Sequence, residues 1–105
     1  MDNVKFVKTL DKRLKKIRAT LITKGYEYAR GDRLSNFKKI AVFRNKTPED
    51  VLFGLVAKHI AALDDFVQDI EQGKAQPLAR WYEKVGDIMS YMVLLDAMVQ
   101  ERLAQ

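Results

Sequence analysis

The sequence predicts an all-α protein, a helical bundle with three to four helices in each protomer, and three observations support this. Apolar residues recur every three to four positions over most of the chain, which is the period of an amphipathic helix. No segment shows the sustained apolar–polar alternation of a half-buried strand. The 105 residues, 48% of them hydrophobic, suit one small domain with a buried core. We expect a single domain over residues 1–105, with a basic N-terminal helix (1–23) and a core (24–105).

The first predicted helix spans residues 4–22. Its apolar row consists of Val4, Val7, Leu10, Leu14, Ile17 and Leu21. The other side is rich in lysine and is either a solvated surface or a face that binds polyanions. Gly25 supplies a helix stop, and residues 25–35 contain two glycines without helical or strand periodicity. We therefore expect a structured loop after the first helix.

Two further helices are expected in the middle of the chain. Residues 36–43 form a short predicted helix that ends near Asn45. Thr47 and Pro48 mark the start of a longer one, because threonine caps helices and proline suits the first helical position. Gly73 is a left-handed stop at its end. Its apolar stripe is Leu52, Leu55, Val56, His59, Ile60, Leu63, Phe66, Val67 and Ile70.

The last predicted helix spans residues 79–103 and is rich in apolar side chains. Its buried side is expected to hold Trp81, Val85, Ile88, Met92, Leu95, Met98 and Val99. Met89, Leu94 and Leu103 widen this stripe beyond what one neighbouring helix would cover. We therefore expect a homo-oligomer, most simply formed with another copy of the chain.

Charge divides the chain into two halves. Residues 1–46 contain 14 Lys and Arg against 4 Asp and Glu, a net charge of +10, whereas residues 47–105 contain 5 against 10, a net charge of −5. This division suits phosphate and metal handling and also head-to-tail self-association. Charge alone does not choose between them.

Several functional classes are excluded by missing residues and motifs. The absence of cysteine rules out disulfides, zinc–cysteine sites and thiol nucleophiles, and favours a cytoplasmic location. No apolar run approaches the roughly 20 residues that span a bilayer, so no membrane partner is expected. The chain also lacks GxSxG, GxxxxGK[ST] and GxGxxG, so acyl transfer and glycine-loop phosphate binding are not supported.

Acidic residues provide the first candidate site. Glu83 and Asp87 stand four apart on the last predicted helix, so both project from one face and could share Mg²⁺, which prefers oxygen ligands. Alternatively they are an ordinary exposed acidic pair. Asp32 and Asn36, beside the predicted loop, either complete an oxygen-rich site or cap the turn and the short helix.

His59 provides the second candidate site, because it lies on the apolar stripe of its helix. It is either a buried ring satisfied by one hydrogen bond or, together with Lys58, part of the phosphate or base end of a ligand site. In the second case, nearby basic residues would neutralise phosphate charge: Arg30, Arg33, Lys38 and Lys39.

Three segments carry a resemblance to a known family: KGYEYARGDRLSNFKK (24–39), AKHIAALDD (57–65) and EKVGDIMSYMVLLDA (83–97). They resemble short bacteriophage and prophage proteins related to the MazG-like, all-α nucleoside triphosphate pyrophosphohydrolases. The last segment is the most specific, since it is similar to the EExGDxxxYxxLL helix of that superfamily. The resemblance extends from about residue 20 to residue 103 and leaves out most of the first helix.

The resemblance implies an oligomeric enzyme of the bacterial host's cytoplasm that uses Mg²⁺ and water to split a nucleotide between its α and β phosphates. Carried over residue by residue, it implies that the catalytic metal ligands are Glu27, Asp32, Glu83 and Asp87. With this activity as the leading hypothesis, we predict that the nucleotide contacts Arg30, Arg33, Asn36, Lys38, Lys58, His59 and Tyr91.

The sequence departs from the family pattern at both acidic motifs. The usual first motif is two glutamates three apart on a helix, whereas Glu27 and Asp32 are five apart in a loop-like segment. Lys84 stands where a carboxylate three before Asp87 is normal. The alternative is therefore a non-catalytic phage protein on the same scaffold that binds a nucleotide or inhibits a host protein. A third hypothesis is nucleic-acid binding by the basic first helix.

Overall fold

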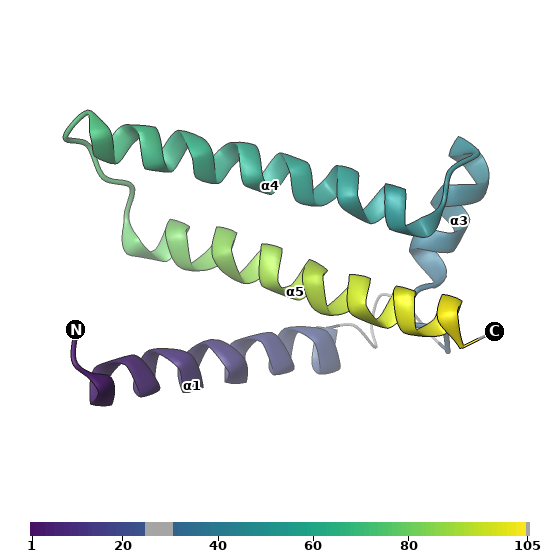
Figure 1. The fold of residues 1–105 in the computed structure, drawn as a ribbon, viewed down its shortest axis with the longest axis horizontal. Helices are drawn as coiled ribbons and strands as arrows, with labels where there is room; N and C mark the ends of the chain where they lie inside the picture. Colours follow the sequence, from purple (N-terminus) through teal and green to yellow (C-terminus); the bar gives the residue numbers. More distant parts are fainter. Residues whose placement is uncertain (25–30, 105) are drawn as a thin grey trace. The chain divides into compact units, whose positions relative to one another are not determined.

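The structure is a computed structural model that describes residues 1–24 and 31–104. These residues form four α-helices and one π-helical turn, and no strand occurs among them (Figure 1). The all-α prediction is therefore confirmed. The chain divides into two compact units, Met1–Arg33 and Leu34–Gln105. Within the described residues, no helix has both the length and the apolar character that crossing a membrane requires.

The first unit is built on helix α1, Asn3–Ala19. It begins after Asp2, whose carboxylate accepts a hydrogen bond from the backbone N–H of Lys5 at 2.8 Å and so caps the helix. The turn η1, Thr20–Lys24, follows with π-helical geometry. Ile17 is buried, but most of the predicted apolar row of α1 is exposed. The exposed members are Val4, Val7, Leu10 and Leu14.

Local sequence signals set the bounds of the next two helices. Helix α3, Ser35–Arg44, ends at Asn45, which adopts a left-handed conformation with φ of 54°. Asparagine is one of the few residues that tolerate this conformation. Helix α4, Pro48–Glu71, follows Thr47, whose hydroxyl accepts a hydrogen bond from the backbone N–H of Asp50 at 3.1 Å. Both boundaries agree with the sequence prediction.

Helix α5, Leu78–Leu103, runs antiparallel to α4, and α3 crosses one end of this hairpin (Figure 1). At the other end, Gly73 allows the chain to turn, because its φ of 77° suits glycine. The ring of Trp81 packs edge-on against Phe66 there, with the ring centroids 5.2 Å apart. The Arg80 guanidinium lies 5.4 Å from the centroid of the Phe66 ring. These contacts fix the turn end of the hairpin.

The core lies toward the opposite end, where α3 meets the hairpin. Its buried residues are Leu34, Leu52, Val56 and Met98, and Leu52 has no exposed surface. Four half-buried residues pack against them, namely Phe37, Tyr91, Leu94 and Leu95. Leu94, expected from the sequence to widen a second contact surface, therefore belongs to this core.

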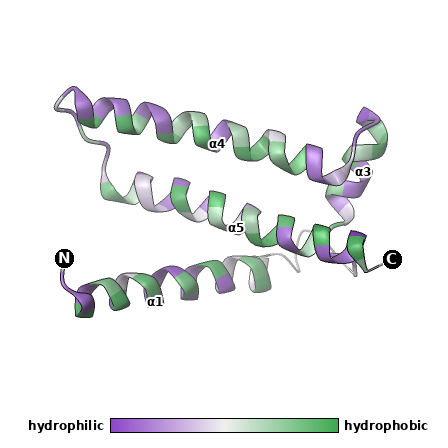
Figure 2. Cartoon of the chain, viewed as in Figure 1, coloured by the Kyte–Doolittle hydropathy of each residue, from purple (hydrophilic) through white to green (hydrophobic). Residues whose placement is uncertain are grey.

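Each helix of the hairpin also carries exposed apolar residues, and Figure 2 shows hydrophobic residues recurring along α1, α4 and α5. On α4, the exposed residues include Phe53, Ile60, Val67 and Ile70. On α5, Met92 and Val99 are exposed, so the prediction that they are buried is wrong for this chain. A helix with two apolar rows can bury only one against a single neighbour, which explains the difference.

Candidate functional site between α4 and α5

Three predicted site residues from two distant segments meet between α4 and α5. The Nδ1 atom of His59, on α4, lies 3.8 Å from Oδ2 of Asp87, on α5. The ring of Tyr91 lies beside the same imidazole, with the ring centroids 5.5 Å apart and the planes tilted by 41°. Two of the three sequence segments with the family resemblance, 57–65 and 83–97, are thus brought together by the hairpin. We call His59, Asp87 and Tyr91 the hairpin cluster.

Helical spacing and core packing together position this cluster. Asp87 and Tyr91 are four residues apart on α5, so their side chains lie one above the other on one side of the helix. The ring of Tyr91 packs against the core, which limits its movement. His59 stands three residues after the buried Val56, on the side of α4 that faces α5.

The polar side chains of the hairpin cluster do not make all the hydrogen bonds that they could. The side chains of His59 and Asp87 are 20% and 43% exposed. Their separation of 3.8 Å is too long for a hydrogen bond. The Nδ1 atom of His59 is buried, and among the described residues it has no hydrogen-bond partner. Buried polar atoms are rarely left in this state, so the imidazole can make a further hydrogen bond.

The electrostatics of the cluster favour a neutral tyrosine. Burial raises the pKa of Tyr91 because it disfavours the charged phenolate, and the negative charge of Asp87 raises that pKa further. The Tyr91 hydroxyl therefore remains a hydrogen-bond donor at neutral pH. A buried imidazole nitrogen, a partly exposed carboxylate and a neutral phenol form a polar patch in the hairpin.

Glu83 extends the patch along α5. It is exposed and lies four residues before Asp87, so both carboxylates belong to one side of the helix. Within residues 1–24 and 31–104, no group of three or more His, Asp or Glu side chains is placed to hold a metal ion. The carboxylate pair nevertheless suits Mg²⁺, which takes oxygen ligands and often binds through one or two carboxylates, waters and substrate phosphates.

The remaining predicted metal and loop residues do not belong to the hairpin. Glu27 and Arg30 lie outside the described residues. Asp32 and Arg33 belong to the first unit, Met1–Arg33. For these four residues, the predicted roles stay predictions.

Three predicted ligand contacts lie in the second unit but outside the hairpin cluster. Asn36 is exposed on the first turn of α3. The Lys38 ammonium lies 2.6 Å from Oε1 of Glu101. Because Glu101 stands fourteen residues after Asp87, their Cα atoms are about 21 Å apart along α5. Lys58 lies on a different side of α4, where it lines a hollow between α4 and α3.

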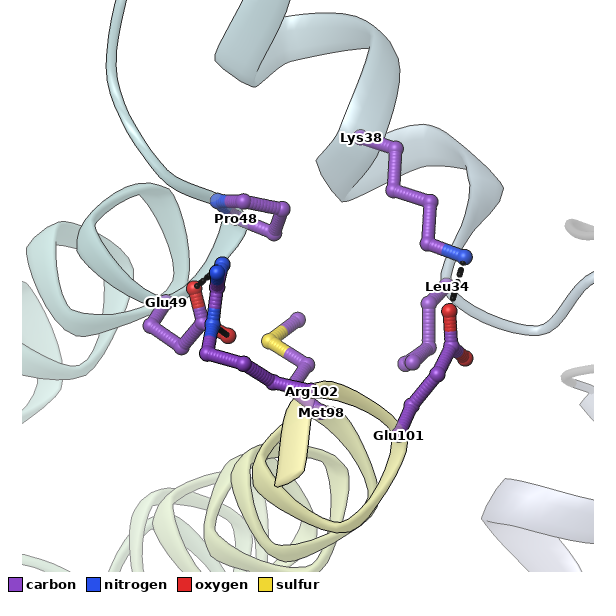
Figure 3. A pocket seen from close by; sticks show the side chains of 7 residues that line it. All are labelled: Leu34, Lys38, Pro48, Glu49, Met98, Glu101 and Arg102. Atoms are coloured by element: carbon purple, nitrogen blue, oxygen red, sulfur yellow. Dashed lines mark hydrogen bonds and ion pairs between the residues drawn. The ribbon is translucent and has the colours of Figure 1, made fainter. Parts of the chain in front are cut away.

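Lys38 instead lines a second site, a cavity of about 230 Å³ where α3, α4 and α5 meet (Figure 3). We call this site the closed end. Its lining residues are Leu34, Lys38, Pro48, Glu49, Met98, Glu101 and Arg102. Arg102 donates two hydrogen bonds to Glu49, of 2.8 and 2.7 Å, which hold the pKa of Glu49 below its usual range. Both cations drawn in Figure 3 are matched by a glutamate, so this cavity has little net charge for an anion.

Lys84, which departs from the family pattern in sequence, also lies in the hairpin. It is half-buried and stands three residues before Asp87 and seven before Tyr91, a spacing that places all three on the same side of α5. The helical periodicity of the sequence therefore suffices to place Lys84 on the side of α5 that carries Asp87 and Tyr91. The spacing of three residues brings its positive charge to the side of α5 that carries Asp87.

No protein-family model, curated protein or solved structure matches the chain. The geometry of the hairpin cluster and the motifs of the sequence are therefore the basis for assigning a function.

Proposed function

We propose that this chain is a Mg²⁺-dependent nucleoside triphosphate pyrophosphohydrolase of the MazG-like type, acting on nucleotides or deoxynucleotides in a phage-infected bacterial cell. One observation carries the proposal: His59, Asp87 and Tyr91, chosen from sequence alone, meet in the hairpin cluster. The spacing of Asp87 and Tyr91 alone puts both on one side of α5, and the register of the hairpin adds His59 from α4. The products would be a nucleoside monophosphate and pyrophosphate.

The carboxylates of Asp87 and Glu83 are the groups in the hairpin that would hold the metal ion. A Mg²⁺ ion held by these carboxylates would supply charge neutralisation for the phosphates. Asp87 is half-exposed and Glu83 is exposed, so a hydrated cation can reach both without any burial of charge. Lys84, three residues before Asp87 on α5, would balance part of the negative charge of Asp87.

His59 and Tyr91 would orient the nucleotide. The Tyr91 hydroxyl, which is protonated at neutral pH, would donate a hydrogen bond to a phosphate oxygen or to the base. The Nδ1 atom of His59 is buried and has no hydrogen-bond partner among the described residues, so it would reach the ligand through a shift of the ring. The core beneath Tyr91 keeps both rings in place.

A second candidate function is nucleotide binding without hydrolysis. It is favoured by the spacing of the acidic groups, since the described residues hold no cluster of three potential metal ligands. Binding by Asp87 and Tyr91 would be retained in this case, and only the release of pyrophosphate would be missing.

The deciding experiment combines turnover and binding on one pair of variants. The purified chain is incubated with a panel of NTPs and dNTPs and Mg²⁺, and pyrophosphate is measured. Asp87→Asn is the test variant, and Asp96→Asn is its matched control because Asp96 is an exposed aspartate on the same helix. We expect Asp87→Asn to lower turnover at least about 100-fold and Asp96→Asn to leave it within about twofold of the wild type.

Calorimetric titration with the same nucleotides separates the two candidate functions. Binding without pyrophosphate release from any nucleotide would overturn the enzyme and favour the binding protein. Neither binding nor turnover would overturn both. Equal losses in Asp87→Asn and Asp96→Asn would show that the hairpin cluster is not the site.

A further inference from the structure

Helix α4 carries an exposed apolar row in addition to the residues that it buries. Phe53, Ile60 and Val67 follow one another at intervals of seven residues and are 58%, 50% and 45% exposed. Seven residues are nearly two helical turns, so the row forms one line about 21 Å long. Apolar residues at this interval are typical of a helix that packs against another helix. We call these three residues the α4 row.

Helix α1 has an apolar row of similar length. From Val4 to Ile17 it covers about 20 Å of helix, and most of its members are exposed. Its spacing of three and four residues gives a single stripe on one side. The two helices thus offer matching rows.

The charges of the two helices are opposite. Helix α1 carries seven Lys and Arg against one Asp, a net charge of +6. Helix α4 carries six Asp and Glu against one Lys, a net charge of −5 with His59 neutral. Complementary charge of this size speeds association and selects the partner helix.

The charges also border the apolar rows. On α4, Asp64 and Glu71 are exposed and follow Ile60 and Val67 by four residues, so they lie along the edge of the α4 row. On α1, Arg18 is exposed and follows Leu14 by four residues. Lys15 is exposed on the same edge, three residues before Arg18.

One copy of α1 offers too little apolar surface for the whole hairpin. The hairpin has two exposed rows, because α5 also exposes Leu78, Met92 and Val99 at multiples of seven residues. Helix α1 presents one row. A second copy of the chain provides both a basic α1 and further apolar surface.

We propose that a second copy of this chain docks on the α4 row, with the basic α1 of one copy lying along the acidic α4 of the other. With twofold symmetry the contact forms twice. In each contact, the basic α1 and its apolar row from one copy pack against the acidic α4 and the α4 row of the other. The association is independent of nucleotide hydrolysis. It assigns a role to the lysine-rich first helix, which lies outside the family resemblance.

The test uses two charge-reversed full-length chains. One carries Asp64→Lys and Glu71→Lys on α4, and the other carries Lys15→Glu and Arg18→Glu on α1. Each chain alone brings like charges together, so we expect the dissociation constant of its dimer to rise at least about tenfold, measured by sedimentation at several concentrations. Mixing the two chains pairs opposite charges again and restores a dimer that contains one copy of each.

Two further measurements keep the outcome clear. Circular dichroism checks that each reversed chain remains helical, and a chain with all four reversals, which restores every α1–α4 pair, is expected to regain the wild-type dissociation constant. Because the paired charges are exposed, raising the salt concentration should weaken the wild-type dimer.

Three results would overturn the proposal. A wild-type chain that stays monomeric at all concentrations rules out the dimer. The two reversed chains could fail to form a mixed dimer while the four-reversal chain behaves as wild type. That result would show that α1 pairs with α4 of the same copy. Binding of a single-stranded oligonucleotide by a monomeric wild-type chain, lost on Lys15→Glu and Arg18→Glu, would make a polyanion the partner of α1.

Discussion

The closed end and the hairpin cluster each bring a nitrogen-bearing side chain toward a carboxylate across α4 and α5, yet the distances between the two groups differ. Glu49 and Arg102 form two hydrogen bonds shorter than 3 Å, whereas Asp87 and His59 remain 3.8 Å apart. Groups that satisfy each other have little left to offer a ligand. Groups held slightly apart over a rigid core can bind one without first breaking an internal bond, which is why we place function at the cluster.

The largest expected effect concerns the core beneath the closed end. Leu52 has no exposed surface, so Leu52→Ala should lower the free energy of unfolding by about 3 kcal/mol in urea titrations. Leu78→Ala removes the same atoms from an exposed position of α5 and should change it by less than about 0.5 kcal/mol. A loss from Glu49→Gln as large as that from Leu52→Ala would show that the ion pair, and not the core, holds this end.

His59→Leu is expected to maintain or raise stability, by up to about 1 kcal/mol, because it removes a buried nitrogen that has no hydrogen-bond partner among the described residues. At the closed end, the corresponding change to leucine, Arg102→Leu, should lower the midpoint of thermal unfolding, because it leaves the Glu49 carboxylate without its partner. A marked loss of stability in His59→Leu would mean that the imidazole is already satisfied and would remove the contrast.

Acid should weaken the closed end. The pKa of Glu49 is lowered in the folded chain, chiefly by its hydrogen bonds to Arg102, so its contribution is fully present above about pH 4.5 and is lost as the pH falls through the lowered value. Thermal unfolding between pH 6 and pH 3 should therefore show a smaller acid-induced decrease for Glu49→Gln, by roughly 2 to 4 °C, than for the wild type. Asp96→Asn, which removes an exposed carboxylate of α5, is the control. An acid-induced decrease equal in Glu49→Gln and the wild type would contradict the prediction.

The smallest effect concerns the alkaline titration of the cluster. Because the pKa of Tyr91 is raised, its contribution to stability is fully present below about pH 10 and is lost as the pH rises through the folded value. Tyrosinate absorbance should show a late-titrating group that disappears in Tyr91→Phe. In Asp87→Asn, that group should titrate earlier, because the negative charge of Asp87 contributes to the shift. If Asp87→Asn left this titration unchanged, the Asp87 carboxylate would be too far from the Tyr91 hydroxyl to affect its pKa.

Local signals allowed the helices to be predicted, because a cap or a stop depends on a few neighbouring residues. Thr47 and Pro48 begin α4, and Asn45 ends α3, as the sequence indicated. Burial was harder to predict. Phe53, Ile60 and Val67 have the same period as Leu52, His59 and Phe66, one residue away, so periodicity does not tell which row faces α5.

For the candidate site too, the sequence predicts individual residues better than their arrangement in space. His59, Asp87 and Tyr91 were selected as residues, but their meeting depends on the register of two antiparallel helices, which no local pattern specifies. The Glu49–Arg102 pair joins residues 53 positions apart and left no trace in the sequence. Lys38 was assigned to the ligand, whereas in the structure its ammonium contacts Glu101.

The edge-on packing of Trp81 against Phe66 makes the chain its own optical reporter. Trp81 is the sole tryptophan, and it stands six residues before Asp87, about 9 Å along α5. Its emission therefore follows the polarity and quenching around one known position of the hairpin. Separation of α4 from α5 at the turn, or a nucleotide base stacking nearby, would change the emission intensity without any attached dye.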